Sequence, residues 1–441
     1  MPPALSRLLA KSGIVLALLG LASFFSVATL STQVPDGADA SPAIVREILR
    51  HHPRGASVLI VLSQTPQDRS LAPELERAVA ASGLHLVGIV AGDPPDARSR
   101  LDTLNASSTR IDAFACSGTS SAWRLLSNVE KDFPALGAPR IHTAAAIRTS
   151  AFLKPSNLLN IANQIAVIAI VAIGMTMVII AGGIDLSVGS LIALSAVVAS
   201  RLIRDFGGAT DASVPMMILC ALAGIFSTGA VGLLTGAVIT RFHVPPFIAT
   251  LSTMLVASGA AFILADGQSI HQLPDRFVAL GRGSGPLGVP YAVLLVAVLY
   301  GAGHVLMSHR RIGRHLYAVG GNAEAARLAG VPVPRVTLFA YTVSGLLAGL
   351  GGIVMASQLK SGSPTYGTMY ELYVIAAVVV GGTSLRGGEG RIVGTLLGTL
   401  TIAVIQNGMN LLNIESYTQK VILGLVILAA VLMDTRQQRK H

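Results

Sequence analysis

The chain has 441 residues, of which 52% are hydrophobic and 12% are charged, and its mean hydropathy is +0.66. Soluble domains carry about 25% charged residues, so the composition argues against a water-soluble enzyme, and its high apolar content argues against a disordered chain. The formal net charge is +10. Because Lys and Arg lie in short connections between apolar runs, we read that charge as a membrane-orientation signal and not as a nucleic-acid-binding surface.

About ten apolar runs approach the roughly 20 residues that a membrane-spanning helix needs. In chain order they are Gly13–Leu30, Leu159–Gly182, Ser190–Ile203, Pro215–Thr240, Phe247–Leu264, Val289–Met307, Thr337–Ser357, Leu372–Gly382, Ile392–Leu412 and Val421–Met433. The third, eighth and last must borrow flanking residues. The first run, preceded by Arg7 and Lys11, also fits a secretory signal with a weak cleavage site at Ala38–Ala40; its 18-residue length favours an uncleaved span.

Loop charges predict the orientation of these spans. With ten spans both termini lie on one side, and that side carries 13 Lys and Arg against 6 in the short loops opposite. The richer side is expected to be cytoplasmic. The predicted domains are therefore residues 1–30 as cytoplasmic N-terminus and first transmembrane helix, 31–150 as an extracytoplasmic domain, 151–435 as the transmembrane domain and 436–441 as a cytoplasmic tail. Residues 151–155, which connect the domain 31–150 to the next span, are expected on the same outer side.

Segment 31–155 has the charge balance of a soluble domain, with 13 basic and 12 acidic residues. Continuous apolar runs predict strands, and 3.6-residue periodicity predicts helices between them. The expected strands are Ser57–Ser63, Leu84–Ala91, Ile111–Cys116 and Arg140–Thr143, and the expected helices are Leu71–Ser82, Asp96–Leu104 and Ala122–Asp132. This alternation predicts an α/β domain with a doubly wound parallel sheet. Cys116 lies in this domain and Cys220 in a predicted span, so we expect no disulfide between them.

The motifs of nucleotide hydrolysis and metal binding are missing from the sequence. No Lys stands in a GxxxxGK[ST] frame, and HExxH and clustered Cys/His are absent, so we predict no catalytic residue and no metal site. Asp185, within GGIDLSVGS at 182–190, is the one clear ionisable residue inside a span. It either caps the following helix through free backbone N–H groups or marks a broken helix that lines a substrate route.

Two groups of amide side chains lie in predicted spans. Gln406, Asn407 and Asn410 are spaced so that Asn410 shares a helix face with both others, and Asn163 and Gln164 form a second pair. Such amides can hydrogen-bond a polyhydroxylated solute along a pathway, or they can bond across helices and hold them together. The sequence leaves both interpretations open.

The loop 308–335 carries the clearest cytoplasmic element. Asn322 is placed to cap a short helix over Ala323–Ala329, which Gly330 and Pro332 then end. Its small alanine face with Leu328, flanked by Arg, suits docking into a groove on another protein, and a solvated basic loop near anionic lipid is the alternative.

Several stretches, in order, closely resemble the permeases of ribose/xylose/galactose-type ATP-binding-cassette (ABC) sugar importers. They are PSNLLNI at 155–161, GGIDLSVGS at 182–190, PPFIATLST at 245–253, GRHLYAVGGNAEAARLA at 313–329, GGTSLRGGEGRIVGTLLG at 381–398 and NGMNLL at 407–412. The resemblance implies a permease dimer in the inner membrane with a separate ATPase and a periplasmic sugar-binding protein. ATP is then used by the partner, and this chain binds no cofactor. The loop with Gly320, Gly321, Asn322, Glu324, Ala326, Arg327 and Gly330 resembles the element that engages the ATPase.

The sequence departs from that family at two places. The family pattern Glu-Leu-Asp reads Glu371-Leu372-Tyr373 here, so sugar identity cannot be carried over. Segment 31–155 replaces a short link and resembles one lobe of a periplasmic sugar-binding protein, which by itself offers half a cleft. We therefore predict a permease that moves a monosaccharide by alternating access driven by a partner ATPase. A membrane-anchored sugar sensor and a secondary transporter are the alternatives.

Overall fold

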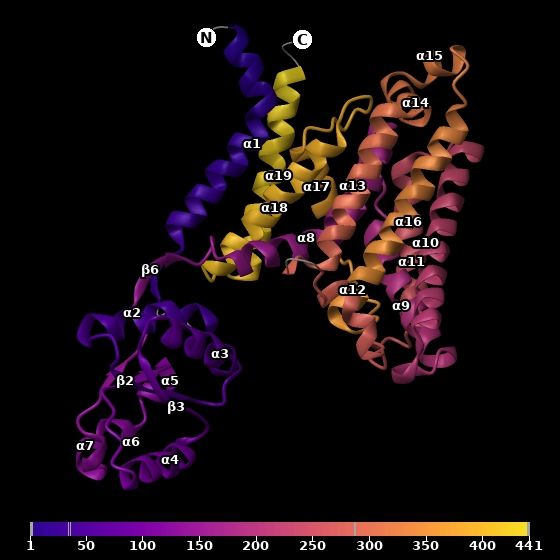
Figure 1. Cartoon of the computed structure of the whole chain (residues 1–441). Helices are drawn as coiled ribbons and strands as arrows, with labels where there is room; N and C mark the ends of the chain where they lie inside the picture. The colour runs from indigo at the N-terminus through magenta and orange to yellow at the C-terminus, as the bar shows by residue number, and fades with distance from the viewer. Residues whose placement is uncertain (1–2, 34, 36, 286–287, 439–441) are drawn as a thin grey trace. The chain divides into compact units, whose positions relative to one another are not determined.

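The computed structural model describes residues 3–33, 35, 37–285 and 288–438. The last three residues of the predicted tail 436–441 lie outside that part of the chain. The chain divides into two compact units, an α/β unit at Leu30–Ser150 and a helical unit made of the segments up to Thr29 and from Ala151 onward (Figure 1).

The α/β unit contains two sheets. Its strands are β1 Leu30–Gln33, β2 Ser57–Leu62, β3 His85–Ala91, β4 Ala113–Cys116, β5 Arg140–His142 and β6 Ile147–Ser150; its helices are η1 Gly37–Ala40, α2 Ser41–His51, α3 Pro66–Ala81, α4 Pro94–Ala106, α5 Gly118–Ser121, α6 Arg124–Ser127, α7 Val129–Asp132 and η2 Pro134–Leu136. Strands β2 to β5 form one parallel sheet in the order β3-β2-β4-β5, and β1 pairs antiparallel with β6.

Both faces of the parallel sheet are covered, which explains why the strands read as continuous apolar runs. One face packs against η1, α2 and α3 through a core that includes Ile44, Ile60 and Leu71, and the other packs against α4, α6 and α7 through a core that includes Val61 and Phe114. The four predicted strands are present. Cys116 and Cys220 are both buried free thiols.

Two features of the unit differ from what the sequence predicted. Helix α2 was not predicted, although Pro42 in its first turn and its buried Ile44, Val45 and Ile48 are ordinary signals of an amphipathic helix. The single helix expected over 122–132 is broken at Asn128, where the backbone leaves helical geometry. Ser127 Oγ bonds back to the Arg124 carbonyl, a local bond typical of turns.

The helical unit contains a helix at each of the ten predicted spans. The helices are α1 Pro3–Ala28, α8 Pro155–Ile180, α9 Val188–Phe206, α10 Val214–Phe242, α11 Pro246–Leu264, α13 Tyr291–His309, α16 Val333–Leu359, α17 Tyr370–Val380, α18 Ile392–Leu411 and α19 Ser416–Gln438, with the short η3 Ala209–Asp211, η4 Asp275–Val278, α12 Ala279–Arg282, α14 Arg311–Gly321 and α15 Ala323–Leu328 between them. Among the described residues, six are long and apolar enough to cross a bilayer: α8, α10, α11, α13, α16 and α18. Two shorter apolar helices, Gly13–Ala28 and α17, accompany them.

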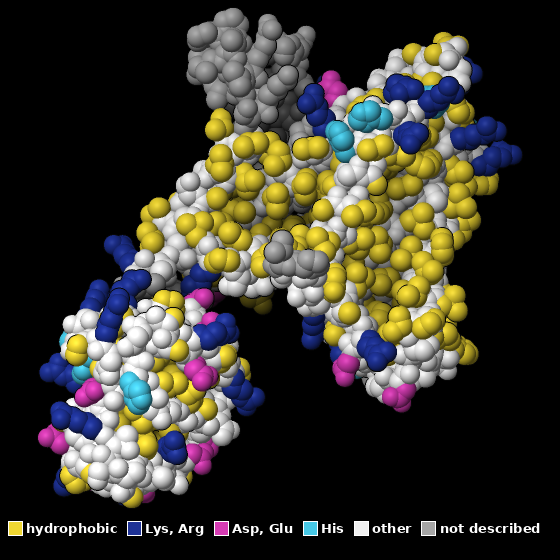
Figure 2. Space-filling view, viewed as in Figure 1, with side chains coloured by type: hydrophobic (Ala, Val, Ile, Leu, Met, Phe, Trp, Pro, Cys, Tyr) yellow, Lys and Arg dark blue, Asp and Glu magenta, His cyan; other side chains and the backbone are white. Residues whose placement is uncertain are grey.

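Helix α8 lies at the centre of this unit. Of its most apolar 18 residues, 89% are buried within the protein, against 22–33% for α10, α11 and α13. Helix α8 packs on α13, α16, α17 and α18, whereas α10, α11 and α13 expose apolar side chains such as Phe226, Leu255 and Val298. Figure 2 shows this hydrophobic surface, with Lys and Arg gathered over α14 and α15. An outer surface of this kind suits contact with lipid, because lipid tails are as apolar as these side chains.

Candidate functional site

Asp185 lies in the non-helical turn between α8 and α9 and is 1% exposed. One carboxylate oxygen, Oδ1, accepts hydrogen bonds from the backbone N–H and the hydroxyl of Ser187, at 3.0 and 2.6 Å. The other, Oδ2, accepts the hydroxyl of Ser344 on α16 at 2.7 Å. Three hydrogen bonds satisfy the buried carboxylate and tie the turn to α16.

Asp185 is therefore not itself the cap residue of α9, although it accepts the free backbone N–H of the cap residue, Ser187. Ser187 occupies the cap position of α9, and Asp185 bonds to Ser187 instead of to the free N–H groups of the first helical turn. Packing of α16 against α8 explains the additional bond to Ser344. Ser344 comes close because Gly174 on α8 has no side chain, and a Cβ on Gly174 would lie 2.7 Å from Ser344 Cα.

The amides of α18 make interhelical bonds. Asn407 is 8% exposed and exchanges two hydrogen bonds with Asn157 of α8, at 3.0 and 2.9 Å. Asn410 is exposed and its Oδ1 accepts from Gln419 Nε2 of α19 at 2.8 Å. Gln406 is half-buried. Asn407 and Asn410 thus hold helices together, as one of the two interpretations expected.

Asn163 and Gln164, next to each other on α8, have different surroundings. Asn163 Nδ2 donates to the Gly281 carbonyl at 3.2 Å, and its backbone carbonyl accepts from Gln358 Nε2 of α16 at 3.0 Å. Among the described residues, Asn163 Oδ1 is a buried oxygen without a hydrogen-bond partner. Gln164 is exposed. Asn163 therefore makes contacts between α8 and its neighbours, whereas Gln164 does not face the protein interior.

The sequence reasoning missed a second non-helical segment, 360–369, which joins α16 to α17. Lys360 ends α16 in the left-handed region at φ +52°. A Cβ on Gly362 would meet Ser200 Oγ at 2.4 Å, and one on Gly367 would meet the Gly189 carbonyl at 2.3 Å. The segment thus runs along α9 from near its end to its first turn.

The non-helical segment 360–369 touches the first turn of α9 at Gly189, two residues after the non-helical segment 181–187 ends. Irregular backbone inside a membrane protein is tolerated where other protein covers it or where it lines a water-filled cavity. Thr365 and Thr368 are exposed and Glu371 is half-buried at this place, next to Tyr370 and Tyr373, whose ring centroids are 6.2 Å apart. The Gly- and Ser-rich SGSPTYG at 361–367, which interrupts an apolar stretch, was the sequence signal for it.

Helix α15 has the cap that the sequence predicted. Asn322 Oδ1 accepts the Ala325 N–H at 2.9 Å, and Gly330 follows at φ +82°. Glu324 and Arg327, both exposed, form an ion pair at 2.5 Å. These contacts confirm a capped helix that ends at the predicted place.

The alanine face of α15 does not point outward as a whole. Ala326 is 5% exposed and packs into the protein's own core, whereas Leu328 is 76% exposed. Ala326 is therefore not part of an exposed docking face, whereas Ala323, Ala325 and Ala329 are exposed as the prediction requires. The exposed surface of α15 consists of Leu328, the Glu324–Arg327 pair and these three alanines.

Three chain segments meet backbone to backbone beside α14. A Cβ on Gly320 would lie 1.7 Å from the Ile180 carbonyl oxygen, and the Gly388 N–H donates to that same oxygen at 2.9 Å. Tyr317 on α14 donates its hydroxyl to the Gly390 carbonyl at 2.8 Å. We call this contact of Ile180, Gly320 and Gly388 the glycine junction. It joins α14 to the end of α8 and to the loop between α17 and α18.

A bundle of apolar helices joined by irregular, glycine-containing segments is an arrangement found in membrane transporters. A family model described as the permease component of a branched-chain amino acid transport system matches residues 157–431. The chain belongs to this family of transport permeases and is not an enzyme. The matched range lies wholly inside the helical unit, so the α/β unit is outside it.

Curated relatives are similar over nearly their full length. The ribose import permease protein RbsC of Escherichia coli K12 is 43% identical over 292 residues, which are 65% of this chain and 88% of the relative. RbsC of Bacillus subtilis is 41% identical, covering 70% and 94%. The L-arabinose ABC transporter permease protein AraH of Azospirillum brasilense is 38% identical, covering 66% and 83%. No solved structure gives a significant match.

Proposed function

We propose that this chain is the membrane permease of an ABC importer and carries a monosaccharide into the cell. The observation that carries the proposal is its 43% identity to a ribose import permease over 88% of that protein. Relatives named for L-arabinose and D-allose, at 38% and 34% identity, widen the substrate class to aldoses. All ten helices cross the inner membrane in this proposal, although six meet the criteria of length and hydropathy among the described residues.

The place where Gly367 meets Gly189 is the proposed sugar site. The exposed hydroxyls of Thr365 and Thr368 and the carboxylate of Glu371 offer hydrogen bonds to sugar hydroxyls, and two aromatic rings lie nearby. Gln164 is a further candidate, and Asp185 supports the site by holding one of the two segments. Gln406 stays a prediction as a pathway residue, and Asn163, Asn407 and Asn410 serve helix packing.

The surface of α15 is the proposed contact with a separate ATPase. Leu328 is 76% exposed on a short capped helix, where Ala323, Ala325 and Ala329 are exposed as well. The chain has no nucleotide-binding motif of its own, so ATP is used by that partner. We propose two copies of the permease per transporter.

The α/β unit lies outside the cell membrane in this proposal, with both chain termini in the cytoplasm. In a doubly wound sheet a ligand binds at the carboxyl ends of the strands, where the strand order reverses. That place, between β2 and β4, is filled. Asp68 accepts from Ser63 Oγ at 2.6 Å and from Ser117 Oγ at 2.9 Å, and the cavity beside Cys116 and Ser117 measures about 10 Å³. We therefore propose that the unit positions a sugar-binding protein and binds neutral sugar weakly.

Reconstitution tests the transport proposal. The permease is purified with each ABC ATPase of its native host, and the complex is placed in liposomes with ATP on the ATPase side. Uptake of labelled D-ribose, L-arabinose and D-allose is then measured in the presence of a periplasmic sugar-binding protein. ATP-dependent uptake of one aldose supports the proposal. Uptake without ATP hydrolysis would identify a secondary transporter, and sugar binding without uptake would favour a sensor.

A further inference from the structure

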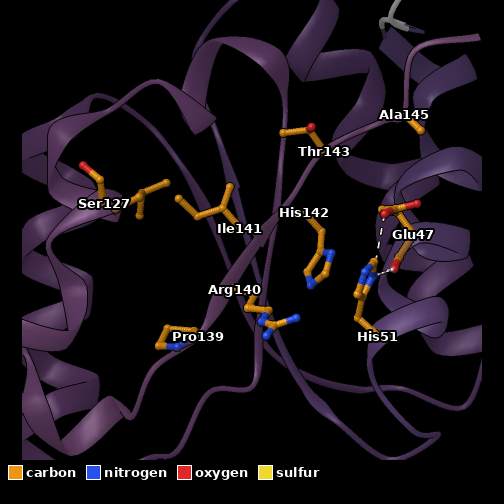
Figure 3. Close-up of a pocket in the computed structure, with 10 residues that line it drawn as sticks. Glu47, His51, Ser127, Pro139, Arg140, Ile141, His142, Thr143 and Ala145 are labelled. Atoms are coloured by element: carbon orange, nitrogen blue, oxygen red, sulfur yellow. Dashed lines mark hydrogen bonds and ion pairs between the residues drawn. The ribbon is translucent and has the colours of Figure 1, made fainter.

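The α/β unit also contains a trough beside its edge strand, separate from the small cavity at Cys116 and Ser117. It measures about 550 Å³ and lies along β5, between α2 on one side and α6 on the other (Figure 3). Glu47 and His51 of α2, Ser127 of α6, and Arg140, His142 and Thr143 line it.

The trough exists because β5 is an edge strand. In the order β3-β2-β4-β5, only one side of β5 is paired. The Arg140 N–H donates to Asp112 beside β4, and backbone groups alternate in direction along a parallel strand. The backbone N–H and C=O of Ile141 therefore point away from β4, toward the unpaired edge of β5. They supply donors and acceptors that a bound molecule with hydroxyl groups can use.

The charges around the trough leave one cation uncompensated. The Glu47 carboxylate is balanced by Arg50 at 3.0 Å and lies 3.6 Å from His51 Nδ1. His142 is 5% exposed, and its Nε2 lies 3.1 Å from His52 Nε2. The Arg140 guanidinium, in contrast, makes no hydrogen bond or ion pair within the described residues. A guanidinium fork is suited to bidentate pairing with a carboxylate or phosphate.

The remaining residues that line the trough suit a molecule of monosaccharide size. Ser127 and Thr143 add hydroxyls, and Leu126 with Ile141 adds an apolar patch. A trough of this size accommodates a monosaccharide, since pockets for small ligands start at about 300 Å³. We propose that the trough binds a small hydroxylated anion, a sugar acid or a sugar phosphate, with Arg140 pairing its negative charge.

Calorimetry on the full chain in nanodiscs of neutral phospholipid tests the site. The probes are D-galacturonate and D-ribose 5-phosphate, with D-galactose and D-ribose as neutral counterparts. We expect both anions to bind at least about tenfold more tightly than their counterparts, the effect of a good charge-assisted pair. Arg140→Gln should remove that difference. Arg124→Gln is the matched control, since Arg124 is exposed in the same unit and does not line the trough.

Four results would overturn the proposal: no binding of either anion, equal binding of the neutral sugars, equal losses in the two variants, or full anion binding by Arg140→Gln. Thermal unfolding of both variants checks that the unit stays folded, and Ser127→Val, which leaves the charges intact, should weaken binding by less than Arg140→Gln. Nanodiscs with anionic phospholipid distinguish the source of the anion. Lost galacturonate binding there assigns the site to a lipid headgroup, and unchanged binding assigns it to a free solute.

Discussion

The glycine junction predicts a sharp difference between two neighbouring substitutions in α14. In Gly320→Ala the new methyl group would lie 1.7 Å from the Ile180 carbonyl oxygen and 2.5 Å from Gly388 N. Real Cβ contacts are essentially never shorter than 3.0 Å, so the two segments must separate by more than an ångström. Overpacking of this kind costs about 1–3 kcal/mol, and loss of the 2.9 Å bond from Gly388 to Ile180 adds about 1 kcal/mol.

Gly321→Ala is the matched control. A Cβ there meets nothing within 4 Å, and Ala is favoured over Gly in a helix by up to about 1 kcal/mol. We therefore expect Gly321→Ala to behave as the wild type.

The assay compares the two variants in three measurements: folded yield, amount of ATPase that co-purifies, and sugar transported per ATP hydrolysed. If the junction passes motion from α15 to α8, Gly320→Ala keeps the ATPase, because Leu328 and its neighbours are untouched, but transports less sugar per ATP. Equal transport by the two variants at equal yield would refute the reasoning. Failure of the wild type to bind any ATPase would instead refute the proposed function.

Four further predictions follow from single contacts. Leu328→Asp should reduce the amount of ATPase that co-purifies without loss of folded permease, because the side chain is 76% exposed. Ala326→Asp should instead lower the folded yield, because it buries a charge. Equal folded yields of the two variants would contradict this. Asp185→Asn should be tolerated and Asp185→Leu should cost about 1–3 kcal/mol, because Ser187 and Ser344 lose a buried acceptor; equal transport loss at normal yield would point to a requirement for charge. Burial and the neighbouring His52 lower the pKa of His142 from 6.5 to about 4. Above pH 6.5 this histidine is neutral in both states and costs no stability, but as the pH falls to 4 the free energy of unfolding of the α/β unit should drop by on the order of 3 kcal/mol. Hydrogen exchange of β5 in the full chain measures this drop, and His142→Phe should remove the dependence of stability on pH. Burial raises the pKa of the Cys116 thiol to about 12, so maleimide should leave Cys116 unlabelled in the native chain and label it after denaturation.

Much of this protein could be predicted from the sequence by local patterns. Apolar length places a helix at each of the ten predicted spans, since a bilayer admits few alternatives to a helix. Continuous apolar runs separated by helical periods gave the four parallel strands, since a sheet covered on both faces needs apolar residues throughout. Asn322 and Gly330 set the ends of α15, because a cap depends on residues within one turn. Helix α2 carried similar local signals and was overlooked.

Only the tertiary structure determines which of these residues contact one another and which are buried. Asp185 bonds Ser344, 159 positions away, because Gly174 lets α16 approach α8. Asn407 pairs with Asn157 across 250 positions, which the helical periodicity of α18 cannot show. Ala326 turns inward and Leu328 outward because α15 packs on the unit, although a six-residue helix has no intrinsic preference for either face. The trough along β5 depends on strand order, and strand order is set by packing between segments distant in the chain.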